Sequence, residues 1–111
     1  MKYFETRFLK EAEDFIRTLD QKSRSKIFYN IDLAEQTNDP RLFKKLKDEI
    51  WEFRSKYMGK QYRLLAFWDK RDKTETLVFA THGFIKKDQK TSQNEIERAE
   101  RVRQGYFNDK D

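Results

Sequence analysis

The sequence predicts an α+β fold in which an N-terminal helical pair and a C-terminal helix pack on an antiparallel sheet of three or four strands. Two observations lead to this prediction. Apolar residues recur at helical spacing near both ends of the chain, and the middle alternates in the manner of strands joined by short polar turns. A chain of 111 residues is expected to form one domain over residues 1–111, with a single core.

The N-terminal third is predicted to be helical. The first helix is expected over residues 6–19, since its apolar positions share one face: Phe8, Ala12, Phe15, Ile16 and Leu19. A second helix is expected over residues 22–37, antiparallel to the first because the connection is short. Asp39 can cap and Pro40 can begin a short following turn of helix. Lys2-Tyr3-Phe4 can add a strand to the sheet.

Residues 42–57 fit two structures. Their apolar residues match a helical stripe, whereas Trp51-Glu52-Phe53-Arg54 alternates as a strand does. A strand over 49–57 is favoured because the strands that follow need a partner.

Those following strands are predicted at 62–68 and 76–82, on either side of a polar turn at 69–73. Connections this short force antiparallel neighbours. Ser92-Gln93-Asn94-Glu95 has the form of a capping box and predicts the start of the last helix. If the first two helices cover one face of the sheet, the other face stays partly open.

Composition excludes several classes of site. The chain has no cysteine and one histidine, which leaves no thiolate or multi-histidine metal site, and we expect neither a metal nor another cofactor. No apolar run approaches the ~20 residues that span a bilayer, and the N-terminus has no signal-peptide core. The sequence therefore predicts a cytoplasmic protein without membrane contact.

The positive charge is concentrated in the middle of the chain. Residues 41–73 carry 11 basic and 5 acidic groups, against 7 and 8 in residues 1–40 and 7 and 7 in residues 74–111. A localised positive field suits a polyanionic partner such as a nucleic acid. A solvated basic face is the alternative, because 41% of the residues are charged.

Arg63 is the first candidate site residue, because it lies inside a predicted buried strand, where an unpaired charge is costly. It could bind the scissile phosphate of a nucleic acid and stabilise charge that develops in the transition state. It could equally be the cross-strand partner of Glu52 or Glu75.

Three lysines follow the last predicted strand. Lys86, Lys87 and Lys90 could contact phosphates from a loop, and one of them could carry a proton if its neighbours lower its pKa. They could also be ordinary solubilising residues. His82 is the candidate proton carrier, with one of the lysines as the alternative, because its unperturbed pKa suits proton transfer near neutrality. A histidine at a strand end is nevertheless more often a packed, hydrogen-bonded residue.

Further residues are candidates for contacts with RNA through charge or base stacking. Each also has an ordinary structural interpretation, because aromatic residues form much of the core in a small domain. These candidates are Arg54, Lys56, Lys60, Tyr62, Phe84 and Lys90.

Residues 41–107 resemble toxins of the RelE/ParE superfamily, and within it the HigB-like branch described as phage-derived. The segments that carry the resemblance are Leu46 with Ile50-Trp51-Glu52-Phe53-Arg54, Tyr62-Arg63-Leu64, His82-Gly83-Phe84-Ile85-Lys86-Lys87 with Gln89-Lys90-Thr91, and Glu95-Ile96-Glu97-Arg98-Ala99. Arg63 matches the strand arginine of the family, and Lys86 and Lys87 match its basic pair. The chain departs from the best-studied type in having no clear tyrosine directly after the last strand, and Tyr106 lies near the end of the final helix instead.

The resemblance implies a RelE-like fold and the toxin of a type II toxin–antitoxin pair. It also implies a metal-independent, ribosome-dependent mRNA endonuclease that acts through the 2′-hydroxyl of its substrate. Its partners would be mRNA on the ribosome and a cognate helix-turn-helix antitoxin. Two alternatives stay open: a ParE-like toxin that inhibits gyrase without cutting RNA, and a regulator that binds nucleic acid without catalysis.

Overall fold

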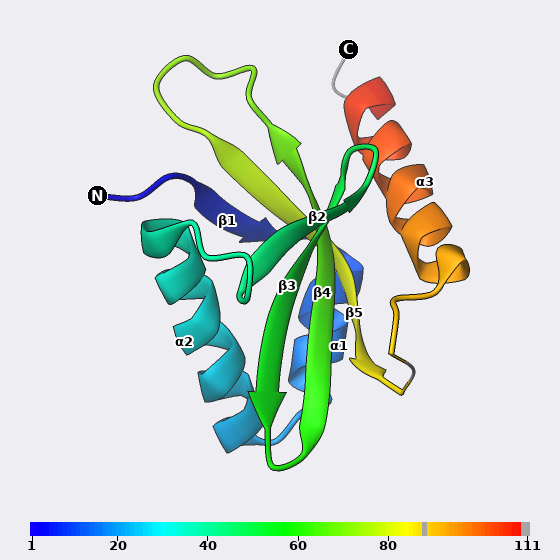
Figure 1. Cartoon of the computed structure of the whole chain (residues 1–111). Coiled ribbons are helices and arrows are strands. Elements are labelled where there is room, and N and C mark those ends of the chain that lie inside the picture. Colours follow the sequence, from blue (N-terminus) through cyan, green and yellow to red (C-terminus); the bar gives the residue numbers. More distant parts are fainter. Residues whose placement is uncertain (88, 110–111) are drawn as a thin grey trace.

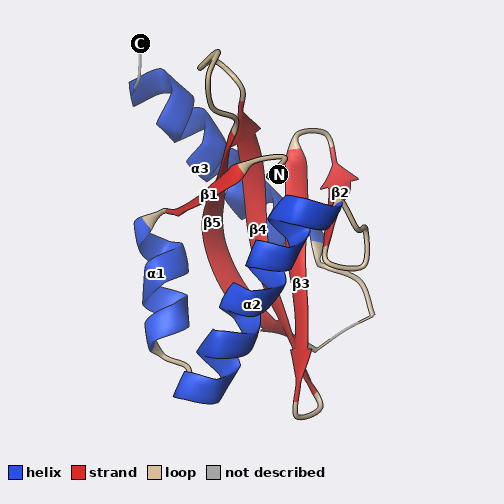
Figure 2. Ribbon diagram, turned by 90° about the vertical axis from the view of Figure 1, so that its left-hand side faces the viewer, coloured by secondary structure: helices blue, strands red, loops and turns tan. Residues whose placement is uncertain are grey.

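The computed structural model of the protein describes residues 1–87 and 89–109. Within these residues a central five-stranded sheet has helices on both faces (Figures 1 and 2). In chain order the elements are β1 (Glu5–Phe8), α1 (Lys10–Arg17), α2 (Gln21–Thr37), β2 (Phe43–Lys47), β3 (Ile50–Tyr57), β4 (Lys60–Asp69), β5 (Leu77–Lys86) and α3 (Gln93–Asp109). The predicted α+β class and the three helices are confirmed.

The sheet is larger than predicted and mixed in direction. Its strand order is β1-β5-β4-β3-β2, in which β2 to β5 are antiparallel neighbours and β1 runs parallel to β5. The prediction of three or four strictly antiparallel strands is therefore wrong. The predicted meander is present as β3, β4 and β5, and the sheet has one further strand on each side of it.

The N-terminal strand expected at Lys2-Tyr3-Phe4 lies instead at Glu5–Phe8, where it replaces the start of the predicted helix over 6–19. Residues Glu5–Phe8 pair with Leu77–Ala80 of β5, and helix α1 begins only at Lys10. Phe8 satisfies both patterns, since it lies on the apolar stripe of a helix and also alternates with the exposed Arg7 in a strand. The parallel partner that decides between them is about 70 residues away, which a local pattern does not show.

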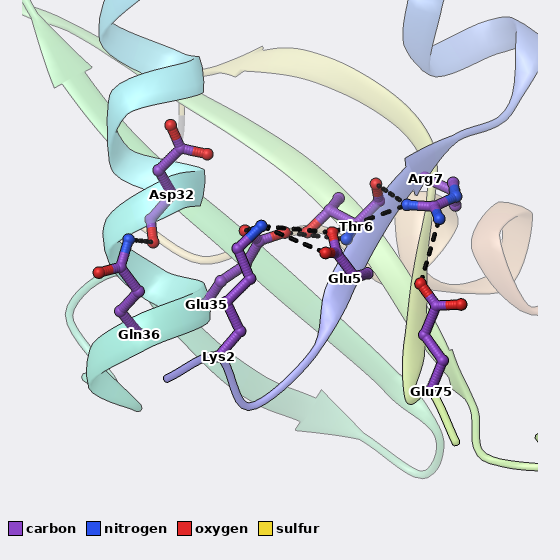
Figure 3. Close-up of polar contacts among 8 residues, drawn as sticks. All are labelled: Lys2, Glu5, Thr6, Arg7, Asp32, Glu35, Gln36 and Glu75. Carbon is purple, nitrogen blue, oxygen red and sulfur yellow. Dashed lines mark hydrogen bonds and ion pairs between the residues drawn. The ribbon is translucent and has the colours of Figure 1, made fainter. Parts of the chain in front are cut away.

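The outer edge of β1 is covered by a side chain of α2 (Figure 3). Glu35 is 4% exposed, and its carboxylate accepts a hydrogen bond from the Thr6 backbone N–H at 2.9 Å. Nζ of Lys2 lies 3.5 Å from the same carboxylate, so the negative charge of the buried Glu35 is paired. On the other side, Arg7 pairs with Glu75 at 3.3 Å. This edge is thus protected against pairing with another strand.

The second added strand, β2, lies within the segment that sequence left ambiguous. Asn38 ends α2 in a left-handed conformation, with φ of 55°. Asp39 caps the following turn, because its Oδ1 accepts from the Arg41 N–H at 2.8 Å. Phe43 and Lys44 then pair with Phe53 and Glu52 of β3, and the strand predicted at 49–57 is confirmed.

Strands β4 and β5 are longer than predicted. The β3–β4 hairpin closes through Met58 and Gly59, both at positive φ (52° and 78°), as in the tight turns that match strand twist. β5 continues to Lys86, and one residue of it, Thr81, is extra relative to β4. This bulge bends β5, as Figure 2 shows.

The two faces of the sheet carry different amounts of helix. Helices α1 and α2 cover one face, over a core that includes Ile16, Ile31, Phe53 and Val78. Helix α3 covers part of the other face through Ala99 and Ile96, over Ile50 and Leu65. The described helices include none with the length and apolarity to cross a bilayer.

Candidate functional site

The sheet face beneath α3 changes from apolar to basic along the strands. At one end Phe67 of β4 stacks against Phe79 of β5, with Tyr106 of α3 over both. Towards the β3–β4 hairpin the cross-strand rows are Glu52–Leu65–His82, then Arg54–Arg63–Phe84, then Lys56–Gln61–Lys86. In the last two rows only Phe84 packs against the small core beneath α3. This half of the face, called the basic half of the sheet below, is therefore where charged groups can meet a ligand.

A buried carboxylate organises this half of the face. Glu52 is 2% exposed. Its carboxylate lies 3.5 Å from Nε of Arg63 and 3.7 Å from Nε of Arg54, and the Thr91 hydroxyl donates a hydrogen bond to it. A buried carboxylate is tolerated when cations and donors surround it in this way. Arg54, Arg63 and Lys86, arranged around Glu52, are called the basic cluster below.

Arg63 is the deepest member of the basic cluster, with 3% of its side chain exposed. Its Nη2 donates to Oε1 of Gln61 at 2.7 Å, and its Nη1 donates to the Tyr62 carbonyl at 3.1 Å. Burial lowers its pKa, an effect that Glu52 opposes and the charge of Arg54 reinforces. Of the two predicted ion-pair partners, Glu52 is the one observed, since Glu75 pairs with Arg7. Arg63 is therefore held beneath the surface of the basic cluster, where it contributes positive charge.

Two nitrogen atoms of the basic cluster have hydrogen-bonding capacity to spare. Nε of Arg54 and Nε of Arg63 are buried, and neither has a hydrogen-bond partner within the described residues. Arg54 is the more accessible of the two, with 31% of its side chain exposed. It is the arginine that a bound phosphate would meet first.

Lys86 is the last residue of β5, so the expectation that it lies on a loop is wrong. Its pKa is lowered by partial burial and then by the neighbouring charge of Arg63, while Glu52 opposes the shift. Lys87 and Lys90 follow it and are exposed. All three lysines line a small groove of about 140 Å³ together with Phe84, Ser92 and Glu95.

His82 lies away from the basic cluster, between the sheet and α3. It is 1% exposed. Its Nδ1 is 2.9 Å from the Thr81 hydroxyl, and its Nε2 is 2.9 Å from Oε1 of Glu95 at the start of α3. Burial lowers its pKa, and the hydrogen bond to Glu95 opposes that shift. Both ring nitrogens are thus engaged in holding the helix to the bulge.

The other candidates for RNA contact divide between the two faces. Tyr62 points to the opposite face, where its hydroxyl meets Oγ of Ser23 at 3.1 Å in the main core. Lys56 lies in the same cross-strand row as Lys86, on the basic half of the sheet. Lys60 lies at the tip of the β3–β4 hairpin. Phe84 is half-buried and packs against the small core beneath α3. The structure therefore brings Arg54, Lys56 and Phe84 to the basic cluster and places Tyr62 elsewhere.

Sequence reasoning assigned no role to two members of this site. Thr91 reaches Glu52 from the segment that precedes α3, and Lys44 lies directly across from Glu52 on β2. A strand over 43–47 would have put Lys44 in register with the meander, so the unrecognised strand is the reason that it was missed. Nothing in the local pattern around Thr91 indicates its contact.

The described residues bring together no group of three side chains that could hold a metal ion. Residues 14–104 match the model of a protein family described as "Phage derived protein Gp49-like (DUF891)". No curated protein matches this chain.

Proposed function

This chain belongs to the Gp49-like phage-derived family, which is a family of RelE/ParE-like toxins, and from that premise we propose that it is the toxin of a type II toxin–antitoxin pair. We assign it to the HigB-like branch and propose that it cleaves mRNA on the ribosome without a metal. The family match covers α2 and the basic half of the sheet, which supports carrying the toxin function over to this chain.

The observation that carries the nuclease proposal is the basic cluster on the open half of the sheet. Two arginines and a lysine of lowered pKa surround one buried carboxylate, which offsets only one of their three charges. Positive groups held rigidly on strands are suited to stabilising charge that develops on a phosphate. A protein that acts on gyrase through contact alone would have no use for such a group of residues.

The proposed reaction uses the nucleophile that RNA itself supplies. Lys86 in its neutral form takes the proton from a 2′-hydroxyl, and that oxygen attacks the adjacent phosphorus. The bond from phosphorus to the 5′-oxygen breaks, and this oxygen takes up a proton. The products are a 2′,3′-cyclic phosphate and a 5′-hydroxyl.

We assign the remaining cations roles according to how deeply each is buried. Arg54 contacts the non-bridging oxygens as their charge increases, and Arg63 behind it maintains the positive potential. Lys87 and Lys90 are exposed beside Lys86. Lys87 positions the strand through its charge, and Lys90 returns the proton to the leaving oxygen. We assign His82 to holding α3 and not to proton transfer, because it is buried with both ring nitrogens occupied.

The partners belong to the proposal as well. A cognate helix-turn-helix antitoxin neutralises the toxin, and ribosome-bound mRNA is the substrate, which places the activity in the cytoplasm. Phe84, half-buried beside the basic cluster, is proposed to stack on a base next to the cleaved bond.

The test combines induced expression with mapping of mRNA 5′ ends and an assay on purified ribosomes. We expect growth arrest with new 5′-hydroxyl ends, and a loss of roughly a hundredfold in cleavage rate for Arg54→Ala. Lys73→Ala, an exposed lysine in the β4–β5 turn, should leave the rate unchanged. Growth arrest without new mRNA ends would contradict the nuclease and favour gyrase inhibition.

A further inference from the structure

A groove of about 450 Å³ lies along the free edge of β3, between the sheet and α2. Five cationic side chains from four parts of the chain line it: Lys26, Arg41, Arg54, Lys56 and Arg63. None of the described residues that line it is acidic. Arg54 and Arg63 belong both to this groove, called the edge groove below, and to the basic cluster, so the two surfaces are continuous.

The positive charge of the edge groove is only partly neutralised by residues behind it. Arg41 forms an ion pair with Asp39 at 2.9 Å, and Glu52 lies between Arg54 and Arg63. Two carboxylates against five cations leave an excess of three positive charges. Lys26 and Lys56 form no ion pair within the described residues. A site with this imbalance favours an anion.

Two buried polar side chains in the edge groove have no partner. Asn30 is 8% exposed and Ser55 is 6% exposed, and both line the groove. Within residues 1–87 and 89–109 neither side chain makes a hydrogen bond. The polar atoms of these two side chains are not among the fully buried atoms that lack a partner, so they reach solvent in the groove and are available to donate to a ligand.

The strand edge supplies a further donor. β2 pairs with β3 only as far as Phe53, and the N–H of Arg54 points outward to the Leu42 carbonyl. Backbone groups of a strand alternate in direction, so the N–H of Lys56 points outward as well. No described strand lies beside it there. The edge groove therefore combines cations, a hydroxyl, an amide and a backbone donor.

We propose that the edge groove is a second phosphate subsite of the RNA-binding surface, which holds a phosphodiester of the same strand near the one at the basic cluster. This inference rests on the proposed function, since it assumes RNA at the basic cluster. An RNA strand that crosses the free edge of β3 would contact Arg54 and Arg63 on one side of the edge. It would contact Lys26, Arg41 and Asn30 on the other side. The strand would thus be held on both sides of the edge.

The lining favours RNA over a protein segment. Leu42 is the only apolar residue among those that line the edge groove, whereas stable protein interfaces depend on buried aromatic or aliphatic anchors. Neutral donors beside cations match the non-bridging oxygens of a phosphodiester. An acidic peptide is the competing ligand, and the experiment includes it.

The experiment measures fluorescence anisotropy of a short single-stranded RNA that is 2′-O-methylated throughout, so that it cannot be cleaved. The full chain is titrated over a series of salt concentrations. For the variant with both Lys26→Ala and Arg41→Ala we expect affinity about tenfold lower, with the slope of log affinity against log salt smaller by about 1.4, or about 0.7 per lost phosphate contact. The control carries Lys22→Ala and Lys45→Ala, which remove two exposed cations outside the edge groove.

A second variant tests, without removing a cation, whether the edge groove holds an anion. Asn30→Asp changes one atom and places a carboxylate in the edge groove, so RNA affinity should fall severalfold, while Asn108→Asp at the end of α3 should not lower it. Thermal unfolding confirms that each variant is folded, and Lys26→Ala alone keeps the test valid if a variant with a substitution at Arg41 or Asn30 is unstable.

The outcomes separate this proposal from the one on which it rests. If the wild-type chain binds RNA and the groove variants behave like their controls, the edge groove is not a phosphate subsite and the proposed function stands. If the wild-type chain neither binds RNA nor cleaves mRNA, both proposals fail. If polyglutamate binds in a manner that depends on Lys26 while RNA binding does not, the edge groove is a protein-binding surface.

Discussion

Glu52 is the residue on which the geometry of the basic cluster depends. Its carboxylate lies within 4 Å of both guanidinium groups and accepts from Thr91. It therefore fixes two arginines that would otherwise repel each other, and it does so from a buried position. Cations held in place before the substrate arrives stabilise a transition state without a cost of reorganisation.

The proposed base can be tested by a change that keeps its charge. Lys86→Arg preserves a cation at the end of β5 but removes an amine that can give up its proton, because a guanidinium stays charged. We expect cleavage on purified ribosomes to fall by about a hundredfold or more, with binding of uncleavable RNA nearly unchanged. Since the pKa of Lys86 is lowered, the wild-type rate should rise with pH until it passes that pKa, and the arginine variant should lose this rise.

Lys87→Arg is the matched control, because Lys87 is exposed beside Lys86 and its proposed role is charge alone. It should retain most of the cleavage rate. If Lys86→Arg cleaves as fast as the wild-type chain, Lys86 contributes charge and some other group takes the proton.

Gly83 should not tolerate a larger side chain. A Cβ at this position would lie 2.3 Å from Cδ2 of Phe15 and 2.7 Å from Cδ2 of Leu64, which requires α1 or the core to move. We expect Gly83→Ala to lower the free energy of unfolding by about 1–3 kcal/mol, as overpacking does. Urea denaturation monitored by circular dichroism measures the change.

The paired control is Gly105→Ala in α3, where a Cβ would meet nothing within 4 Å. Alanine in a helix interior is favoured over glycine by roughly 0.5–1 kcal/mol, so this variant should be more stable than the wild-type chain. Equal effects at the two glycines would contradict the packing of Phe15 on β5.

The residues differ in how far sequence could predict their surroundings. Glu52 was a foreseeable partner of Arg63, because both are charged residues at inward positions of neighbouring predicted strands. The surroundings of His82 were not foreseeable. They depend on a bulge at Thr81 and on the docking of α3, and neither leaves a local pattern.

At the scale of elements, α3 is attached to the sheet at both of its ends. Glu95 meets His82 near the N-terminus, and the Tyr106 hydroxyl donates to Asp69 at 2.8 Å near the C-terminus. Ser92 caps the helix as predicted, since its Oγ accepts from the Glu95 N–H at 3.3 Å. The capping-box carboxylate of Glu95 is used for His82.

Removing Glu95 should loosen the start of α3. Glu95→Ala leaves Nε2 of the buried His82 without its partner, which costs about 1–3 kcal/mol. Hydrogen exchange of the first turns of α3 should accelerate more than exchange in the α1–α2 layer. Glu97→Ala, an exposed position two residues later, should change neither the stability nor the exchange rates appreciably.

The lowered pKa of Asp69 predicts the pH range over which the protein loses stability in acid. Hydrogen bonds from Arg71, and then from Tyr106, lower its pKa to about 2 from 3.8. A folded pKa below the unfolded pKa means that the contribution is present above about pH 4 and is lost as pH falls from there towards 2. The loss should be on the order of 1–2 kcal/mol, measured by urea denaturation at several pH values.

Asp69→Asn provides the comparison for this acid limb. The variant should be less stable than the wild-type chain at neutral pH, and the difference between the two should shrink as pH falls through 3.8. A difference that stays constant would show that Asp69 does not titrate with the folded state.

The elements that sequence predicted are those with strong local patterns: α2, the meander β3 to β5, and α3. Strand β2, which was missed, and strand β1, which was misplaced, are the two outermost of the sheet. Each is short, and each is defined by a partner strand and not by its own alternation. Short edge strands carry a weak local pattern, and this explains both errors.

At the scale of the whole molecule, the excess positive charge lies in the sheet layer and not in the helical layer of α1 and α2. The chain segment that forms β2, β3 and β4 carries 11 basic and 5 acidic groups, whereas the segment with β1, α1 and α2 is close to neutral. The unequal helical cover of the two faces leaves the basic half of the sheet accessible. A sheet open on one basic face is therefore available to a polyanion, while the helical layer opposite is nearly uncharged overall.

This asymmetry predicts that association with ribosomes depends steeply on salt. Each phosphate contact releases counterions, so several contacts should reduce affinity by roughly a thousandfold or more between low and physiological salt. Sedimentation of the chain with purified ribosomes over a series of potassium chloride concentrations measures the slope. Replacing Lys44 and Lys56, which border the basic cluster, with alanine should flatten the slope, whereas replacing Lys22 and Lys70 should alter it less. A slope near zero for the wild-type chain would mean that the basic face binds through contacts other than phosphates, and a protein surface would then be the better assignment for it.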